Sequence, residues 1–125
     1  MTAGPWTLTT RDGSQVEHEH FETLDQAIAA LERHVAELGD STLREEERFL
    51  SRRIEPVRLV AARLEIAGPR SGGGALRGGG TVRGGVDLRG DGSAEAFTGR
   101  VRRAVVARHT GESAPQALRR ALSAA

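Results

Sequence analysis

The 125-residue sequence contains no cysteine, no lysine and no tyrosine, and only 3% of its residues are aromatic. The lack of cysteine excludes disulfides, thiolate nucleophiles and zinc sites built on cysteine. It also favours a reducing compartment, so we expect a cytoplasmic protein. The lack of lysine removes the side chain with which a P-loop reaches a phosphate group, and we expect no cofactor.

Long hydrophobic runs are also missing. The longest apolar run, Ala27–Leu31, has five residues, and Leu59–Ala62 and Ala104–Ala107 have four each, whereas a membrane-spanning helix needs about 20. The first ten residues carry neither a basic region nor an apolar region, so we expect no signal peptide. These features predict a protein that does not interact with membranes.

Large aliphatic side chains are scarce, since Leu, Val, Ile and Phe account for 27 of the 125 residues. The length fits a single domain spanning residues 1–125, but such a domain has little apolar area for its core. We therefore expect it to gain stability as a homodimer. The two expected C-terminal helices form the surface on which two copies should meet, with a stripe of alanines on the last helix, residues 113–125, and Val106 on the helix before it.

Charge is distributed unevenly, and all 18 basic residues are arginine. Residues 1–55 hold 12 acidic residues and 6 arginines, a net charge of −6. Residues 56–125 hold 5 acidic residues and 12 arginines, a net charge of +7. This asymmetry indicates either an anion-binding half or two halves that attract each other, within one chain or across a dimer.

The N-terminal half predicts a hairpin followed by two helices. The strands are expected at Trp6–Thr10 and Gln15–Phe21, joined by a turn at Asp12-Gly13. A three-residue loop over 12–14 keeps carboxylates off the face of Trp6 and Leu8, and it places His18 and His20 on that face. An apolar stripe predicts a helix over 24–38, with Thr23 and Gln26 as a capping box and Gly39 as its end. A second capping box, Thr42 with Glu45, predicts a shorter helix to about Arg53.

The C-terminal half predicts a second pair of strands and two more helices. Strands are expected at Val57–Ala67 and Val82–Arg89, with a flexible glycine-rich loop at about 68–85 and a bulge at Gly84-Gly85. Asp91-Gly92-Ser93 is expected to lead into a helix that places Phe97 and Val105 on one face. Ser113 and Gln116 are expected to cap the last helix. The expected fold is α+β, a small antiparallel sheet of two hairpins covered by helices, in the order ββα-α-ββ-αα.

Three histidines form a candidate metal site. His18 and His20 lie two residues apart on a strand and therefore point the same way, and His34 lies beside the apolar stripe of the following helix. If that helix packs on the hairpin, the three imidazoles converge and could bind one metal ion. The other interpretation is that the histidines are half-buried and hydrogen-bonded to the backbone or to Glu17 and Glu19.

Arginines dominate the C-terminal segment and form a candidate anion-binding or nucleic-acid-binding site. The set is Arg100, Arg102, Arg103, Arg108, Arg119 and Arg120. A basic helical surface without exposed aromatic residues contacts phosphates but does not read bases. The other interpretation is a solvated face, or salt bridges to the acidic N-terminal half.

No recognisable catalytic motif is present in the sequence. We therefore expect a non-catalytic interaction, adaptor or regulatory protein that forms a homodimer and binds a protein partner of unknown identity. The first alternative is sequence-nonspecific binding of nucleic acid or another polyanion by the C-terminal arginines. The second is a small metal-binding protein or enzyme centred on the pair His18 and His20.

Overall fold

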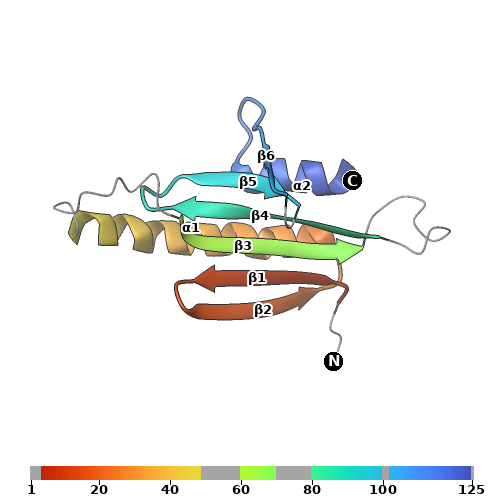
Figure 1. Ribbon diagram of the computed structural model, residues 1–125, viewed down its shortest axis with the longest axis horizontal. Helices are drawn as coiled ribbons and strands as arrows, with labels where there is room; N and C mark the ends of the chain where they lie inside the picture. The colour runs from red at the N-terminus through yellow and green to blue at the C-terminus, as the bar shows by residue number, and fades with distance from the viewer. Residues whose placement is uncertain (1–3, 49–59, 70–79, 100–101, 125) are drawn as a thin grey trace.

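A computed structural model of the chain describes residues 4–48, 60–69, 80–99 and 102–124. Eight elements follow one another in this part of the chain (Figure 1): β1 (Trp6–Asp12), β2 (Gln15–Phe21), α1 (Leu24–Arg48), β3 (Val60–Pro69), β4 (Thr81–Arg89), β5 (Ala94–Thr98), β6 (Ala104–Val106) and α2 (Ala114–Ala124). The strands form one antiparallel sheet in the order β2-β1-β3-β4-β5-β6. The predicted α+β class with an antiparallel sheet is thus confirmed, whereas the predicted order of elements is wrong.

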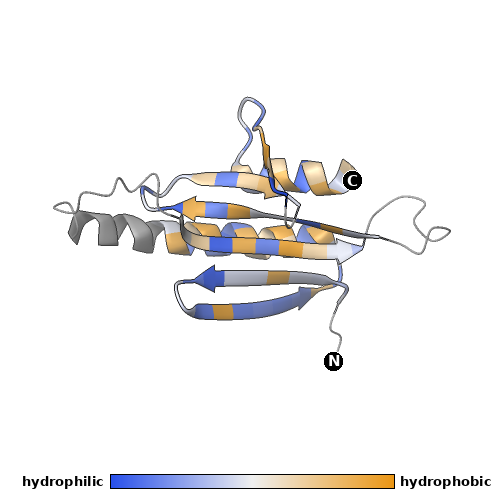
Figure 2. Cartoon of the chain, viewed as in Figure 1, coloured by the Kyte–Doolittle hydropathy of each residue, from blue (hydrophilic) through white to orange (hydrophobic). Residues whose placement is uncertain are grey.

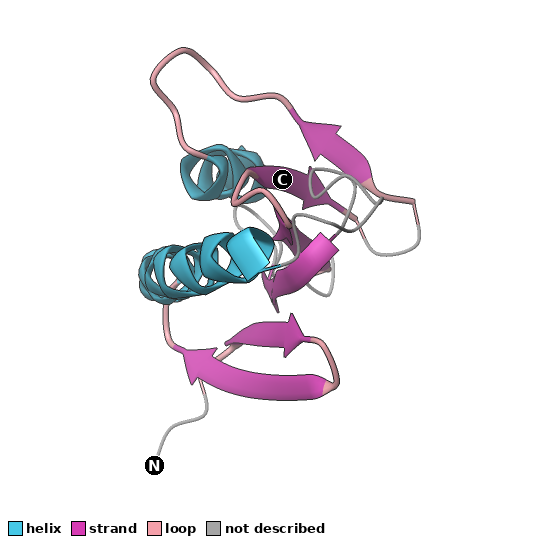
Figure 3. Cartoon of the chain, turned by 90° about the vertical axis from the view of Figure 1, so that its left-hand side faces the viewer, coloured by secondary structure: helices cyan, strands magenta, loops and turns pink. Residues whose placement is uncertain are grey.

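Both helices lie on the same side of the sheet (Figure 3). Side chains alternate along the strands, so that Leu8, Leu64, Ile66 and Val86 are buried on the side of the helices, where Leu118 of α2 joins them in the core. Figure 2 shows the same alternation of hydrophobic and hydrophilic residues along β3. We call the opposite side, which carries the intervening residues of each strand, the open face.

The β1–β2 hairpin has a different register from the predicted one. Asp12 pairs with Gln15 and Leu8 with Glu19, so the loop consists of Gly13 and Ser14 alone. Gly13 has a φ of 61°, as the first loop position of a type II′ turn requires. The expected loop over 12–14 is therefore wrong, and a carboxylate does occupy the face on which Trp6 and Leu8 are buried.

Helix α1 continues through Gly39 to Arg48, so the predicted end at Gly39 is wrong. A glycine that closes a helix takes a positive φ, but Gly39 is not among the described glycines that do so. The predicted cap at Thr23 is confirmed, since Gln26 N–H donates to Thr23 Oγ1 at 3.1 Å. The side chains of Thr42 and Glu45, and residues 49–53, lie outside the described residues.

The predicted helix after Ser93 is wrong, because this segment forms strands β5 and β6. Arg89 N–H donates to the carbonyl of Ser93 at 2.8 Å, and Gly92 has a φ of 86°, so the chain turns directly back along β4. The Asp91 carboxylate accepts the backbone N–H and the hydroxyl of Ser93, at 2.9 and 2.6 Å. Asp91 therefore stabilises a hairpin loop and does not cap a helix.

Gly84 and Gly85 form a regular part of β4 and not the predicted bulge. They pair with Ile66 and Glu65 on β3 without a shift of register. A Cβ atom on Gly85 would lie 2.3 Å from the Leu64 carbonyl oxygen, and one on Gly84 would lie 2.6 Å from that of Phe97. These positions therefore need glycine because of close packing, and their φ angles are ordinary. The ends of the predicted glycine-rich loop, 68–69 and 81–85, belong to β3 and β4 instead, and residues 70–79 lie outside the described residues.

Helix α2 is capped as predicted, since the backbone of Ser113 bonds to the Gln116 side chain at 2.8 Å and the Gln116 N–H to Ser113 Oγ at 3.3 Å. Its small apolar stripe, including Ala117 and Leu118, is buried against the sheet of the same chain. This stripe is therefore not free to form the dimer surface expected from the sequence. In the described part of the chain, no helix is both long enough and apolar enough to span a membrane.

Two glycine substitutions test this packing. Gly39→Ala should raise the free energy of unfolding by about 0.5–1 kcal/mol, because alanine favours a helix and a Cβ here would meet nothing within 4 Å. Gly85→Ala should lower it by roughly 1–3 kcal/mol, because the Cβ meets backbone that has to move. Urea denaturation followed by circular dichroism measures both. A stabilising Gly85→Ala would contradict the close approach of β3 and β4.

Candidate functional site

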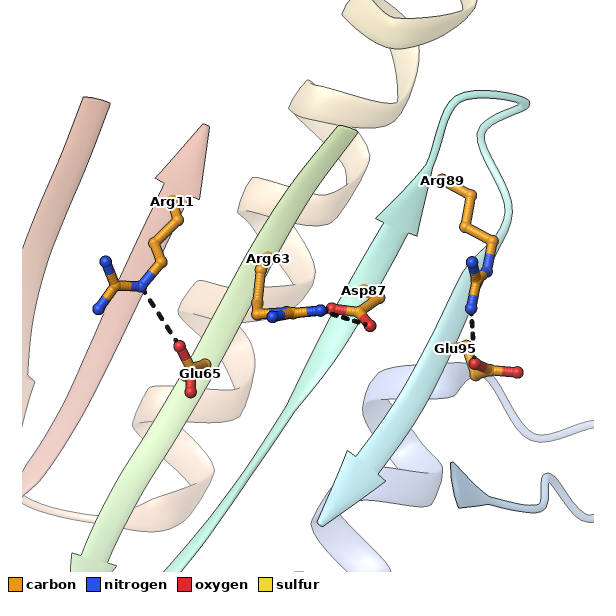
Figure 4. Close-up of polar contacts among 6 residues, drawn as sticks. All are labelled: Arg11, Arg63, Glu65, Asp87, Arg89 and Glu95. Atoms are coloured by element: carbon orange, nitrogen blue, oxygen red, sulfur yellow. Dashed lines mark hydrogen bonds and ion pairs between the residues drawn. The ribbon is translucent and has the colours of Figure 1, made fainter. Parts of the chain in front are cut away.

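The open face carries three ion pairs between neighbouring strands (Figure 4). Arg63 on β3 donates two hydrogen bonds to Asp87 on β4, at 2.6 and 3.2 Å. The other two pairs are Arg11–Glu65, at 3.4 Å, and Arg89–Glu95, at 2.7 Å. Each pair joins residues on strands that are adjacent in the sheet, so the three pairs form a ladder across β1, β3, β4 and β5.

Arg63 and Asp87 form the most protected of these pairs. Their side chains are 29% and 12% exposed, and the two residues lie directly opposite each other in the β3–β4 register. The hydrogen bonds to Asp87 raise the pKa of Arg63 above its ordinary value. The Arg63 guanidinium is therefore charged, and the two hydrogen bonds to Asp87 fix its position at the centre of the open face.

Phe97 lies on the open face beneath two arginines. Its partner in the β4–β5 register is Gly85, whose missing side chain leaves room for the ring. The guanidinium carbons of Arg103 and Arg63 lie 4.9 and 5.7 Å from the ring centroid, at cation–π distance. Phe97 is only 3% exposed, so its ring is a support for the two guanidinium groups and not a free surface for stacking.

The three candidate metal ligands do not converge. His18 and His20 lie on the open face, where their Nδ1 atoms are 3.1 and 3.3 Å from the hydroxyls of Thr9 and Thr7. His34 lies on α1, on the other side of the sheet, and its Nε2 is 2.6 Å from Glu19 Oε1. The observed hairpin register places Glu19 on the helix side of the sheet and His18 and His20 on the open face. The imidazoles of His18 and His20 are therefore separated from that of His34 by the sheet. Within the described ranges, no cluster of three or more His, Asp or Glu residues could hold a metal ion.

The candidate C-terminal arginines are dispersed as well. Arg102 and Arg103 lie between β5 and β6, and Arg108 lies in the loop after β6, all three exposed. Arg119 and Arg120 lie on α2 and pair with Asp25, at 2.5 Å, and with Glu112, at 2.9 Å. Arg100 is outside the described residues. The predicted basic helical surface is therefore wrong for the described arginines, because among them only Arg119 and Arg120 belong to a helix and both have acidic partners.

Glu112 and Arg120 join the loop after β6 to α2. The Glu112 carboxylate accepts two hydrogen bonds from Arg120, at 2.9 and 3.0 Å, and one from the His109 backbone at 2.9 Å. Arg120 also donates to the Ala107 carbonyl at 2.8 Å. The bonds from Arg120 and then from His109 lower the pKa of Glu112 to about 2.

Sequence reasoning missed the ladder on the open face. Its one local signal is the period-two spacing of Arg63 and Glu65 on β3, and of Asp87 and Arg89 on β4. That spacing shows which residues share a face, but the partners in each pair depend on the order of the strands.

No protein-family model matches the chain, and neither the curated proteins nor the solved structures contain a match to it.

The ion pair of Glu112 predicts a dependence of stability on pH. A carboxylate with a lowered pKa stabilises the folded state above its ordinary pKa of 4.5, and this contribution is lost as the pH falls toward 2. We expect Glu112→Gln to be less stable than the original protein at pH 7 and to lose less stability between pH 5 and pH 2. Thermal unfolding at several pH values measures this. Parallel pH profiles for the two proteins would show that the pair does not contribute.

Proposed function

We propose that the protein is a non-catalytic interaction protein that acts as a homodimer, in which the free edge of β6 is the interface. The charged groups of the open face support the first part of the proposal. General acid–base catalysis uses groups that titrate near the working pH, whereas the guanidinium of an arginine stays charged there, and Asp87 holds that of Arg63 in place with two hydrogen bonds. Such an arrangement suits a surface that presents fixed charges to a partner.

The exposure of Val105 is the observation that carries the homodimer. Val105 lies on β6, the last strand of the sheet, and is 65% exposed. The outer edge of a terminal strand presents unpaired N–H and C=O groups with which another strand can pair. Pairing of β6 with β6 of a second copy would satisfy these groups and bury Val105 on both sides of a two-fold axis.

The opposite edge of the sheet is less suited to pairing. Strand β2 alternates Glu17, His18, Glu19 and His20 along its length, and charged side chains are a common protection of an edge strand. Figure 2 shows this strand as largely hydrophilic. Its exposed valine, Val16, is 44% exposed and stands among polar neighbours, which makes it a matched control for Val105.

Light scattering with paired variants tests the interface. The original protein should have about twice its chain mass of 13.3 kDa at micromolar concentration. We expect Val105→Glu to reduce the mass to that of one chain, because a buried carboxylate without a partner opposes association, and Val16→Glu to leave the dimer intact. A single-chain mass for the original protein would refute the dimer. Dissociation by Val16→Glu alone would place the interface at β2.

Binding of a polyanion by the open face is the second candidate function. Arg83 lies on this face beside Ala67, and Arg103 lies over Phe97. Within the described ranges neither arginine has a carboxylate partner, unlike Arg63 and Arg89. Unpaired arginines above a ladder of neutralised charges would contact phosphates without reading bases.

DNA binding at two salt concentrations tests this second function. Fluorescence anisotropy with a 20-nucleotide oligomer should show affinity that falls steeply from 50 to 200 mM salt. The double variant Arg83→Gln/Arg103→Gln should reduce the slope of log affinity against log salt by about 2, one for each lost phosphate contact. Arg33→Gln, on the exposed side of α1, is the control and should leave the slope unchanged. Equal effects of all these arginines would indicate only general attraction to positive charge.

A further inference from the structure

A pocket lies between the β1–β2 hairpin and the middle of α1, on the helix side of the sheet. Six polar residues line it: Thr10, Asp12, Gln15 and Glu17 from the hairpin, and His34 and Glu37 from α1. None of the three carboxylates forms an ion pair with another described residue, unlike the carboxylates of the open face. The pocket is thus an acidic site whose charges are not neutralised by the described part of the chain.

Thr10 gives this pocket a feature that a cluster of acidic residues alone lacks. It lines the pocket and is only 8% exposed. Its Oγ1 atom is buried and has no hydrogen-bond partner among the described residues. Leaving a buried hydroxyl without a partner costs free energy, so an unpaired hydroxyl in a residue that lines a pocket indicates a missing partner, which a ligand N–H can supply.

His34 completes the wall of the pocket, and its contact is with Glu19, which does not line the pocket. Its Nε2 contacts Glu19 at 2.6 Å, so Glu19 has a partner. Asp12, Glu17 and Glu37 remain as acceptors, together with the Gln15 carbonyl and the Thr10 hydroxyl. A ligand that satisfies this set must be cationic and must donate several hydrogen bonds in different directions.

We propose that this pocket, the hairpin pocket, binds a guanidinium group. A guanidinium carries five N–H donors in one plane, and it forms paired hydrogen bonds with carboxylates. Its donors would reach carboxylates on both the hairpin and α1, while one N–H would be directed at Thr10 Oγ1. An arginine side chain of a protein partner and a small guanidinium compound share this chemistry. The site is separate from the β6 edge and from the open face, so it does not depend on the functions proposed above.

Amide chemical-shift titration of the full chain tests the hairpin pocket with two probes. The first is agmatine, a small guanidinium compound, and the second is the peptide acetyl-Gly-Gly-Arg-Gly-Gly-amide. We expect saturable shifts confined to the hairpin and to the middle of α1, around His34 and Leu38. Tighter binding of the peptide would indicate an arginine of a protein partner, and tighter binding of agmatine would indicate a small ligand. Shifts that do not saturate with either probe, or that spread over all acidic residues, would overturn the proposal.

Two double variants with the same change of net charge separate the pocket from general attraction. Asp12→Asn/Glu37→Gln removes two pocket carboxylates and should weaken binding of the tighter probe at least tenfold. Glu22→Gln/Glu32→Gln removes two exposed carboxylates elsewhere and should change it less than twofold. Equal losses in the two variants would refute a specific site.

Thr10 variants distinguish a ligand-binding hydroxyl from a structural one. Thr10→Val keeps the shape of the side chain but removes the hydroxyl, so it should weaken guanidinium binding roughly three- to tenfold without lowering the melting temperature. Thr10→Ser keeps the hydroxyl and should bind like the original protein. Unchanged binding by Thr10→Val, or a loss of binding by both variants, would contradict the role of Oγ1.

Discussion

The close approach of strands at Gly84 and Gly85 determines what both faces of the sheet can carry. On the helix side, a Cβ atom at Gly84 would lie 2.8 Å from Leu118 of α2, so the missing side chain lets the helix pack directly on β4. On the open face, the space above Gly85 is filled by the Phe97 ring, whose Cζ would lie 2.8 Å from a Cβ there. The ring in turn supports Arg63 and Arg103. A chain poor in large apolar side chains thus fills the middle of its sheet with residues from other elements.

Elements with a strong local signal could be predicted from the sequence, and those that depend on strand pairing could not. The caps at Thr23 and Ser113 and the strands flanking the glycine-rich segment follow from neighbouring residues. The segment from Ala94 to Val106 has apolar residues at helical spacing, but β4 offers it a free edge, and Gly92 and Gly99 adopt the positive φ angles of turns. At Gly39, the packing of α1 on the sheet outweighs the roughly 1 kcal/mol by which glycine disfavours a helix.

Contacts between distant residues explain why little of the candidate site could be predicted. The register predicted for the first hairpin keeps carboxylates away from Trp6 and Leu8. In the observed register Glu19 lies on their face, where His34 supplies it with a partner at 2.6 Å. Similarly, Arg11 and Glu65 are 54 positions apart in the sequence, and only the placement of β3 beside β1 brings them together. The residue types therefore predict that charges pair, while the topology determines which charges pair and which, like Asp12 and Glu17, have no ion-pair partner among the described residues.

The order of the strands also determines how the proposed sites relate to one another. The hairpin pocket lies at the β1–β2 end of the sheet, and the β6 edge lies at the other end, with β3, β4 and β5 between them. A dimer joined through β6 would therefore leave one pocket free at each outer end of a continuous sheet. The two open faces would form one surface across the dimer axis, because a two-fold axis perpendicular to the sheet keeps equivalent faces on the same side. Self-association through β6 and ligand binding in the pocket can therefore occur in the same molecule without competing for a surface.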